Sequence, residues 1–207
     1  LSSRNSADVD TVLAGIEFAK QETSGLIVNV LARDVADHVD QLRGNVEALS
    51  NFFPKLSVVI FENDSKDGSR EAFKKWAAIP EKGYEIDLMA CPEAEDCKIG
   101  QDHRYDGKKE EDFFTKSSIG NMHKYRQKML DYIVDNPVYD RYSHMMPVDL
   151  DVGVSLSPLG VLHSIGKVQN NAAVASSCRQ PWPGGLGTLV PPYDFNAFES
   201  IDTPDTK

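Results

Sequence analysis

The chain has 207 residues, about enough for one domain, and its 41% hydrophobic and 26% charged residues are typical of a globular protein. Its 22 lysines and arginines against 32 aspartates and glutamates leave a net charge of −10, which argues against a protein that binds the phosphate backbone of nucleic acids. The sequence contains neither an apolar run of about 18 residues that could span a bilayer nor a signal-peptide pattern. Because it begins with Leu1 rather than methionine, we expect a trimmed chain or a fragment.

Helical and strand patterns alternate along the first 90 residues. The helical segments carry apolar residues three and four positions apart, and the strand segments are apolar on both faces, as in parallel sheets. Helices are expected over residues 9–19, 39–52 and 70–77, and strands over residues 26–31, 56–61 and 84–90. This order predicts a single α/β domain, a mostly parallel sheet flanked by helices.

The second half of the chain alternates less regularly. It begins with an acidic loop that we expect to be solvated and ends with thirty residues rich in proline and glycine. The expected segments are the loop 93–112, a helix 117–134, a strand 142–148, a helix 158–168 and a strand 172–176.

Two carboxylates, Asp149 and Asp151, directly follow the strand expected over 142–148. In open α/β sheets, ligands bind at the carboxyl ends of the strands. Paired carboxylates there suit Mn²⁺ or Mg²⁺, which in turn holds a diphosphate. The alternative is a surface turn with two solvated acids.

A dense polar turn, Glu62-Asn-Asp64-Ser-Lys-Asp-Gly-Ser69, follows the strand expected over 56–61. Its acids, Glu62 and Asp64 among them, are placed to accept hydrogen bonds from a nucleobase or a ribose hydroxyl. Turn chemistry alone also explains the composition, and Ser69 is a possible cap for the next helix. A calcium-binding EF-hand loop is excluded, because a loop starting at Asn63 places Lys74 where a glutamate is required.

Arg126 falls near the centre of the apolar face predicted for the helix 117–134. That face is formed by Ile119, Met122, Met129, Leu130 and Ile133. A buried arginine needs a partner, either a core carboxylate or the metal-site acids and donor phosphates.

The order of these motifs, a strand with ENDSKDGS, then a helix, DLDVG and a late YDFNAF, resembles the GT-A glycosyltransferases. The similarity extends over about residues 26–198 and is closest to the fungal capsule-associated α-1,3-mannosyltransferase-like group. It implies a Rossmann-like GT-A fold and transfer of a sugar, with retention, from a UDP- or GDP-sugar to a glycan or glycoprotein acceptor. Mn²⁺ or Mg²⁺ would be the cofactor.

The resemblance also implies roles for individual residues. Ala32, Arg33 and Glu62 would line the nucleoside pocket. Asp149 would face the donor sugar or ribose and share the metal with Asp151.

Two further residues complete the expected catalytic set. Arg126 would lie near the donor, and Asp194 in the late motif is a candidate carboxylate on the acceptor side. The resemblance further suggests the secretory or Golgi lumen, if an anchor precedes the chain, and otherwise the cytoplasm.

Two other functions remain open. In a haloacid-dehalogenase-like phosphatase, Asp149 would be the nucleophile and Asp151 its acid–base partner, although such aspartates usually lie near the start of the domain. The other is a module that binds nucleotide sugar or carbohydrate without turnover.

Cys91 and Cys97 either form a disulfide or remain free thiols. His144 is interpreted as an ordinary strand residue.

Overall fold

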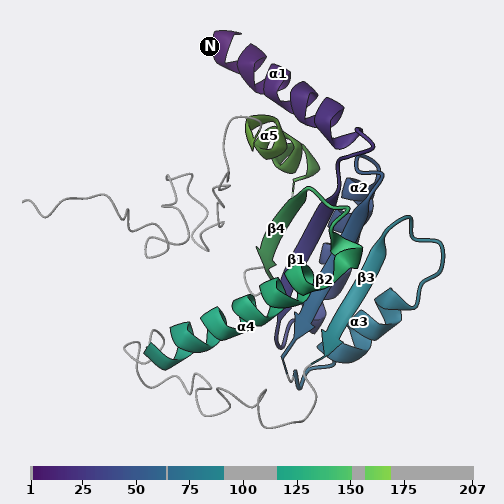
Figure 1. Ribbon diagram of the computed structural model, residues 1–207, viewed down its shortest axis with the longest axis vertical. Helices are drawn as coiled ribbons and strands as arrows, with labels where there is room; N and C mark the ends of the chain where they lie inside the picture. The colour runs from purple at the N-terminus through teal and green to yellow at the C-terminus, as the bar shows by residue number, and fades with distance from the viewer. Residues whose placement is uncertain (1, 64, 91–115, 151–156, 169–207) are drawn as a thin grey trace, which may run out of the picture.

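The computed structural model describes residues 2–63, 65–90, 116–150 and 157–168 (Figure 1). The helices are α1 (Ser2–Ala19), α2 (Val39–Ser50), α3 (Ser69–Ala77), α4 (Lys116–Asp135) and α5 (Pro158–Val168), with short 3-10 turns η1 (Ala36–His38) and η4 (Pro137–Tyr139). The strands are β1 (Leu26–Ala32), β2 (Leu56–Glu62), β3 (Glu85–Ala90) and β4 (His144–Asp149).

Every helix and strand predicted within the described ranges is present, with ends that differ by a few residues. The largest change is at α1, which begins at Ser2 rather than near residue 9. Strand β4 runs from His144 to Asp149, so Asp149 belongs to the strand itself. The predicted loop 93–112 and strand 172–176 lie outside the described residues.

The strands form one parallel sheet in the order β3-β2-β1-β4. Strand β1 therefore lies inside the sheet, between β2 and β4, although it comes first along the chain. Glu62 pairs with Ala32 across β2 and β1, and Asp149 pairs with Leu31 across β4 and β1. The α/β class with a parallel, Rossmann-like sheet is confirmed.

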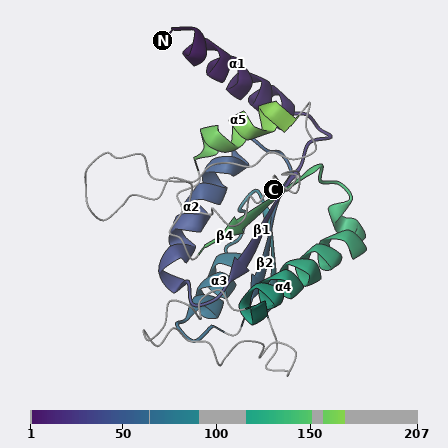
Figure 2. The same ribbon diagram turned by 90° about the vertical axis from the view of Figure 1, so that its left-hand side faces the viewer.

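Helices cover both faces of the sheet, α2 and α3 on one and α4 on the other (Figure 2). Successive side chains of each strand point to opposite faces of the sheet, so strands that are apolar throughout contribute to the core on both sides. On the α2–α3 side the core includes Val28, Val58, Leu42, Phe73 and Trp76, and on the α4 side Ile27, Val59, Phe61, Tyr125 and Met129.

The α4 layer is also tied to edge strand β3 by polar contacts. The hydroxyls of Tyr132 and Tyr139 both donate to the Asp87 carboxylate, Tyr139 at 2.9 Å. Burial and the negative charge of Asp87 raise the pKa of Tyr139. Both phenols therefore stay protonated and act as donors across the neutral pH range.

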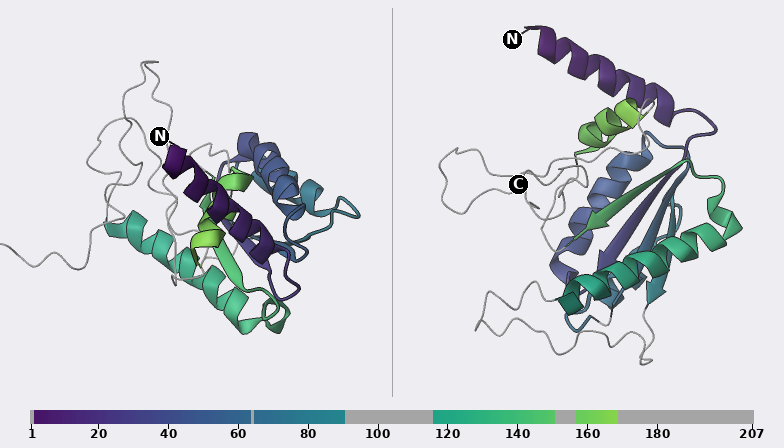
Figure 3. Two further views of the ribbon diagram at one scale, coloured as in Figure 1. Left: turned by 90° about the horizontal axis from the view of Figure 1, so that it is seen from above. Right: turned by 60° about the vertical axis from the view of Figure 1, so that its left-hand side comes forward.

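Helices α1 and α5 form a close pair at one end of the sheet (Figure 3). They cross at two glycines: a Cβ on Gly15 would lie 1.9 Å from the Leu162 carbonyl oxygen, and one on Gly166 would lie 2.1 Å from that of Thr11. These distances leave no room for any side chain, so the crossing depends on glycine at both positions.

His144 begins β4 beneath this helix pair. Its ring packs edge-on against Phe18 with centroids 5.0 Å apart, and its Nδ1 lies 2.9 Å from the Ser143 hydroxyl. Burial lowers the pKa of His144 below its ordinary value of 6.5.

This lowered pKa makes a prediction about stability. As the pH falls below about 6.5, the unfolded chain takes up a proton at His144 before the folded chain does, so the free energy of unfolding should fall. Urea unfolding at about pH 8 and about pH 5 should show a smaller pH-dependent loss in His144→Phe than in the unmodified protein. An identical loss in both proteins would contradict this role for His144.

Candidate functional site

The carboxyl ends of β1, β2 and β4 meet at one edge of the sheet. The chain moves from β1 outward to β2 and β3 on one side and returns to place β4 on the other side of β1. Such a reversal of strand order is where open α/β sheets bind ligands. Asp149 ends β4 directly opposite Leu31 of β1, so its backbone lies at this reversal.

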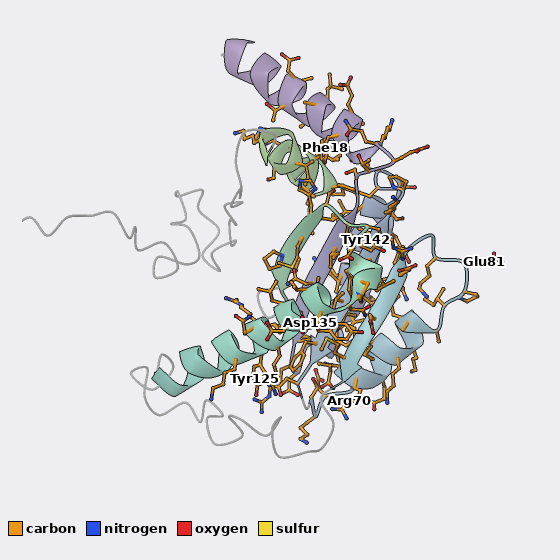
Figure 4. All side chains as sticks on the ribbon, in the orientation of Figure 1. Phe18, Arg70, Glu81, Tyr125, Asp135 and Tyr142 are labelled. Carbon is orange, nitrogen blue, oxygen red and sulfur yellow. The ribbon has the colours of Figure 1, made fainter. Side chains whose placement is uncertain are left out.

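Glu62, the last residue of β2, is fully buried at this edge. One carboxylate oxygen accepts from the Ser65 amide at 2.6 Å, and the other pairs with Nε of Arg70 at 2.5 Å. Figure 4 shows Arg70 at the end of the sheet opposite Phe18. Glu62 thus lies at the expected edge, and both of its carboxylate oxygens bond to residues of the following turn and helix.

The segments after β1 and β2 interlock through hydrogen bonds, in an arrangement that we call the loop junction (residues 34–36 with 65–69). The backbone amides of Asp34, Val35 and Ala36 donate to side-chain oxygens of Ser65, Ser69 and Asp67, at 3.0, 2.8 and 2.8 Å. In return, the Lys66 amide donates to the Asp34 carboxylate at 2.7 Å. Side chains of one loop therefore hold the backbone of the other.

The start of α3 shows how Ser69 is used. Gly68 is the N-terminal capping residue, with the left-handed φ of 95° that favours glycine, and it has no side chain that could cap the helix. Ser69 is the first helical residue, and its hydroxyl donates to Asp67 at 2.6 Å while accepting from Val35. The prediction that Ser69 caps α3 is therefore wrong, because the Ser69 hydroxyl forms hydrogen bonds within the loop junction instead.

Asp67 is the anionic member of the loop junction. Burial acts to raise the pKa of Asp67, but hydrogen bonds from Ser69 and the Ala36 amide outweigh it and hold the pKa below the ordinary value of 3.8.

Asp67→Asn should lower the free energy of unfolding by about 1 kcal/mol at neutral pH, since it removes one acceptor oxygen. The contribution of the ionised Asp67 is complete above pH 3.8 and is lost as the pH falls through the lowered pKa, so the difference should shrink in acid. Denaturant unfolding at about pH 7 and about pH 3 measures this, with the exposed Asp37→Asn as the control. A difference independent of pH would contradict the role of the charge.

Asn63 follows Glu62 and continues the strand ladder by donating its amide to the Ala32 carbonyl at 2.9 Å. Asn63 as a whole is only 8% exposed, and its Oδ1 has no hydrogen-bond partner among the described residues. A buried carbonyl oxygen normally has a partner, so Asn63 is a candidate to bind a ligand or an ordered water. The sequence pattern singled out the neighbouring acids instead, and the only signal for Asn63 was its place at the end of a strand.

The other residues expected to line a nucleoside pocket lie at the same edge. Ala32 is buried at the end of β1. Arg33 follows it with a side chain 33% exposed, and its Nε lies 3.8 Å from the neighbouring Asp34 carboxylate. Ala32, Arg33 and Glu62 are thus brought together, with Arg33 the accessible cation.

Arg126 does not occupy the centre of the apolar face of α4. It is exposed, and the face that packs on the sheet is formed by Tyr125, Met129 and Ile133. Tyr125 contacts Phe61 with ring centroids 5.4 Å apart. The expected burial of Arg126 is wrong because an aromatic residue one position earlier takes the sheet-facing place, which turns Arg126 about 100° away.

Several expected site residues lie outside the described residues: Asp64, Asp151 and Asp194. Of Asp149, the structure describes only the backbone position. Within the described ranges, no three His, Cys, Asp or Glu side chains are close enough to hold a metal ion. The Asp149–Asp151 pair therefore stays a prediction.

Compared with protein-family models, with curated proteins and with solved structures, the chain matches none. Among the helices of the described ranges, none has the length and apolar character needed to cross a membrane.

Proposed function

We propose that the protein is a metal-dependent glycosyltransferase of the GT-A type that moves a sugar from a UDP- or GDP-sugar to a glycan or glycoprotein acceptor. One observation carries the proposal: Asp149, the first acid of the Asp-Leu-Asp motif, ends β4 where the strand order reverses at β1. A nucleotide bound at such a reversal lies across the ends of the two central strands.

The chain offers suitable groups around this position. Arg33 is a partly exposed cation that suits phosphate oxygens, and Asn63 offers an amide for a base or ribose. Asp149 and Asp151 are the residues that would hold Mn²⁺ or Mg²⁺. Bound there, the metal would neutralise the diphosphate that leaves as the sugar is transferred.

The place of Asp149 in the fold favours this function over the phosphatase. A phosphatase aspartate would be expected near the start of the domain, whereas Asp149 follows three earlier strands of the same sheet. An acid that comes late in the chain and ends the strand beside β1, as Asp149 does, fits a ligand-holding role better.

The test is calorimetric titration with UDP-glucose and GDP-mannose, with and without Mn²⁺. Asp149→Asn and Asp151→Asn should each weaken metal-dependent binding about tenfold or more, equivalent to about 1.4 kcal/mol. Asp10→Asn is the matched control, because it removes the same charge from an exposed position on α1.

The possible results of this titration distinguish the three candidate functions. Metal-dependent binding that only the two motif variants lose supports the transferase, and transfer to an acceptor would establish it. Binding without transfer would favour a non-catalytic module. A folded protein that binds no nucleotide sugar but hydrolyses a phosphate monoester would replace the proposal with the phosphatase.

A further inference from the structure

We propose that Glu62 is a positioning residue rather than a ligand contact: through Arg70 and the loop junction it sets the places of Arg33 and Asn63. What these two residues bind rests on the proposed function, whereas the positioning itself does not.

The first argument is the state of the Glu62 carboxylate. It has no exposed surface, and each oxygen already accepts a short bond, from the Ser65 amide at 2.6 Å and from Arg70 at 2.5 Å. Because the carboxylate is fully buried, a ligand could reach it only if Arg70 or the turn 65–69 moved away, and the bond to Arg70 is of the stronger, charge-assisted kind. Neither oxygen is therefore available in this arrangement.

The second argument is the path from Glu62 to Arg33. The bond to Ser65 and the ion pair with Arg70 hold the turn 65–69 against the end of β2. The Ser65 hydroxyl in turn accepts from the Asp34 amide, and the Lys66 amide donates back to Asp34. Arg33 immediately precedes this anchored residue.

Asp34 has a backbone conformation that depends on such anchoring. Its φ is 52°, in the left-handed region that few residues other than glycine adopt. The hydrogen bond that its amide donates to Ser65 and the one that its carboxylate accepts from the Lys66 amide stabilise that conformation. If the turn 65–69 moves, Asp34 is free to return to an ordinary conformation and the backbone of Arg33 turns with it.

Asn63 is placed by the same contacts from the other side. It lies between Glu62, held by Arg70, and Ser65, held by Glu62. Its backbone amide donates to the carbonyl oxygen of Ala32, the residue before Arg33, so its position is coupled to the end of β1. Loosening of the Glu62 contacts should therefore disturb the two candidate ligand-binding side chains together.

The test combines amide hydrogen exchange with donor binding in Glu62→Gln, Arg70→Gln and the double variant. In both single variants, the amides of residues 34–36 should exchange about tenfold faster or more, while those in the middle of β1 keep their rates. Affinity for the nucleotide sugar that the unmodified protein binds should fall by a similar factor in both. The double variant should be little worse than either, because the ion pair between the two residues is already lost in each single variant.

Arg43→Gln is the control for loss of an arginine, since the ion pairs of Arg43 within the described residues join it to Asp40 and Glu47 of the same helix, α2. It should change neither exchange nor affinity.

Three results would overturn the proposal. If Glu62→Gln weakens donor binding while residues 34–36 exchange as before, Glu62 contacts the donor directly. If exchange quickens without any change in affinity, or if neither exchange nor affinity changes, the junction does not position the site. If no nucleotide sugar binds the unmodified protein, the proposed function fails, and the exchange rates still decide whether Glu62 holds the junction.

Discussion

Gly15→Ala should destabilise the docking of α1 on α5 by about 3 kcal/mol, the upper range for an overpacked contact. The added Cβ would lie 1.9 Å from the Leu162 carbonyl oxygen, which is backbone and cannot rotate away. The helices must separate to admit the methyl group, and the same holds for Gly166→Ala against Thr11.

The measurements are thermal unfolding and limited proteolysis of α1, because most contacts of α1 within the described residues are with α5. Gly44→Ala is the matched control: Gly44 lies inside α2 with nothing within 4 Å of its added Cβ. There, alanine should stabilise the protein by about 0.5–1 kcal/mol through its better helix propensity. Loss of stability at Gly44 and none at Gly15 would contradict the described crossing.

Arg70→Met should lower the free energy of unfolding by about 3 kcal/mol, because it leaves the Glu62 carboxylate buried without its cation. Glu62 has no exposed surface, whereas the Arg70 side chain is 22% exposed, so water cannot replace the lost partner at the buried end. Arg43→Met, which breaks two exposed ion pairs of α2, should cost about 1 kcal/mol or less.

Denaturant unfolding measures both variants, and a double variant tests the cause. Glu62→Met combined with Arg70→Met should recover much of the loss, because a buried ion pair replaced on both sides by apolar groups is often neutral. A double variant as unstable as the sum of the two single ones would show that the cost does not arise from the unpaired charge.

The contrast between Glu62 and Asn63 shows that a sequence motif does not predict which of its side chains remains available to a ligand. Both follow the same buried strand, and their chemistry alone made the acid the better candidate for a ligand. In the fold, Glu62 lies on the α2–α3 side with Arg70 eight residues later, while Asn63 keeps an oxygen without a partner in the described part of the chain. Which side chain is left available depends on neighbours that no local pattern reveals.

The order of elements, the parallel sheet and most of the core could be read from the sequence alone, because the spacing of apolar residues distinguishes helices from strands that are buried on both faces. The place of Asp149 at the end of a strand was determined in the same way. Only the tertiary structure settled that β1 separates β2 from β4, that Arg126 is exposed, and that the loops after β1 and β2 are joined. These features arise from contacts between residues far apart in the sequence, such as Tyr125 with Phe61 and the Val35 amide with Ser69, and the local pattern of a segment holds no information about its distant neighbours.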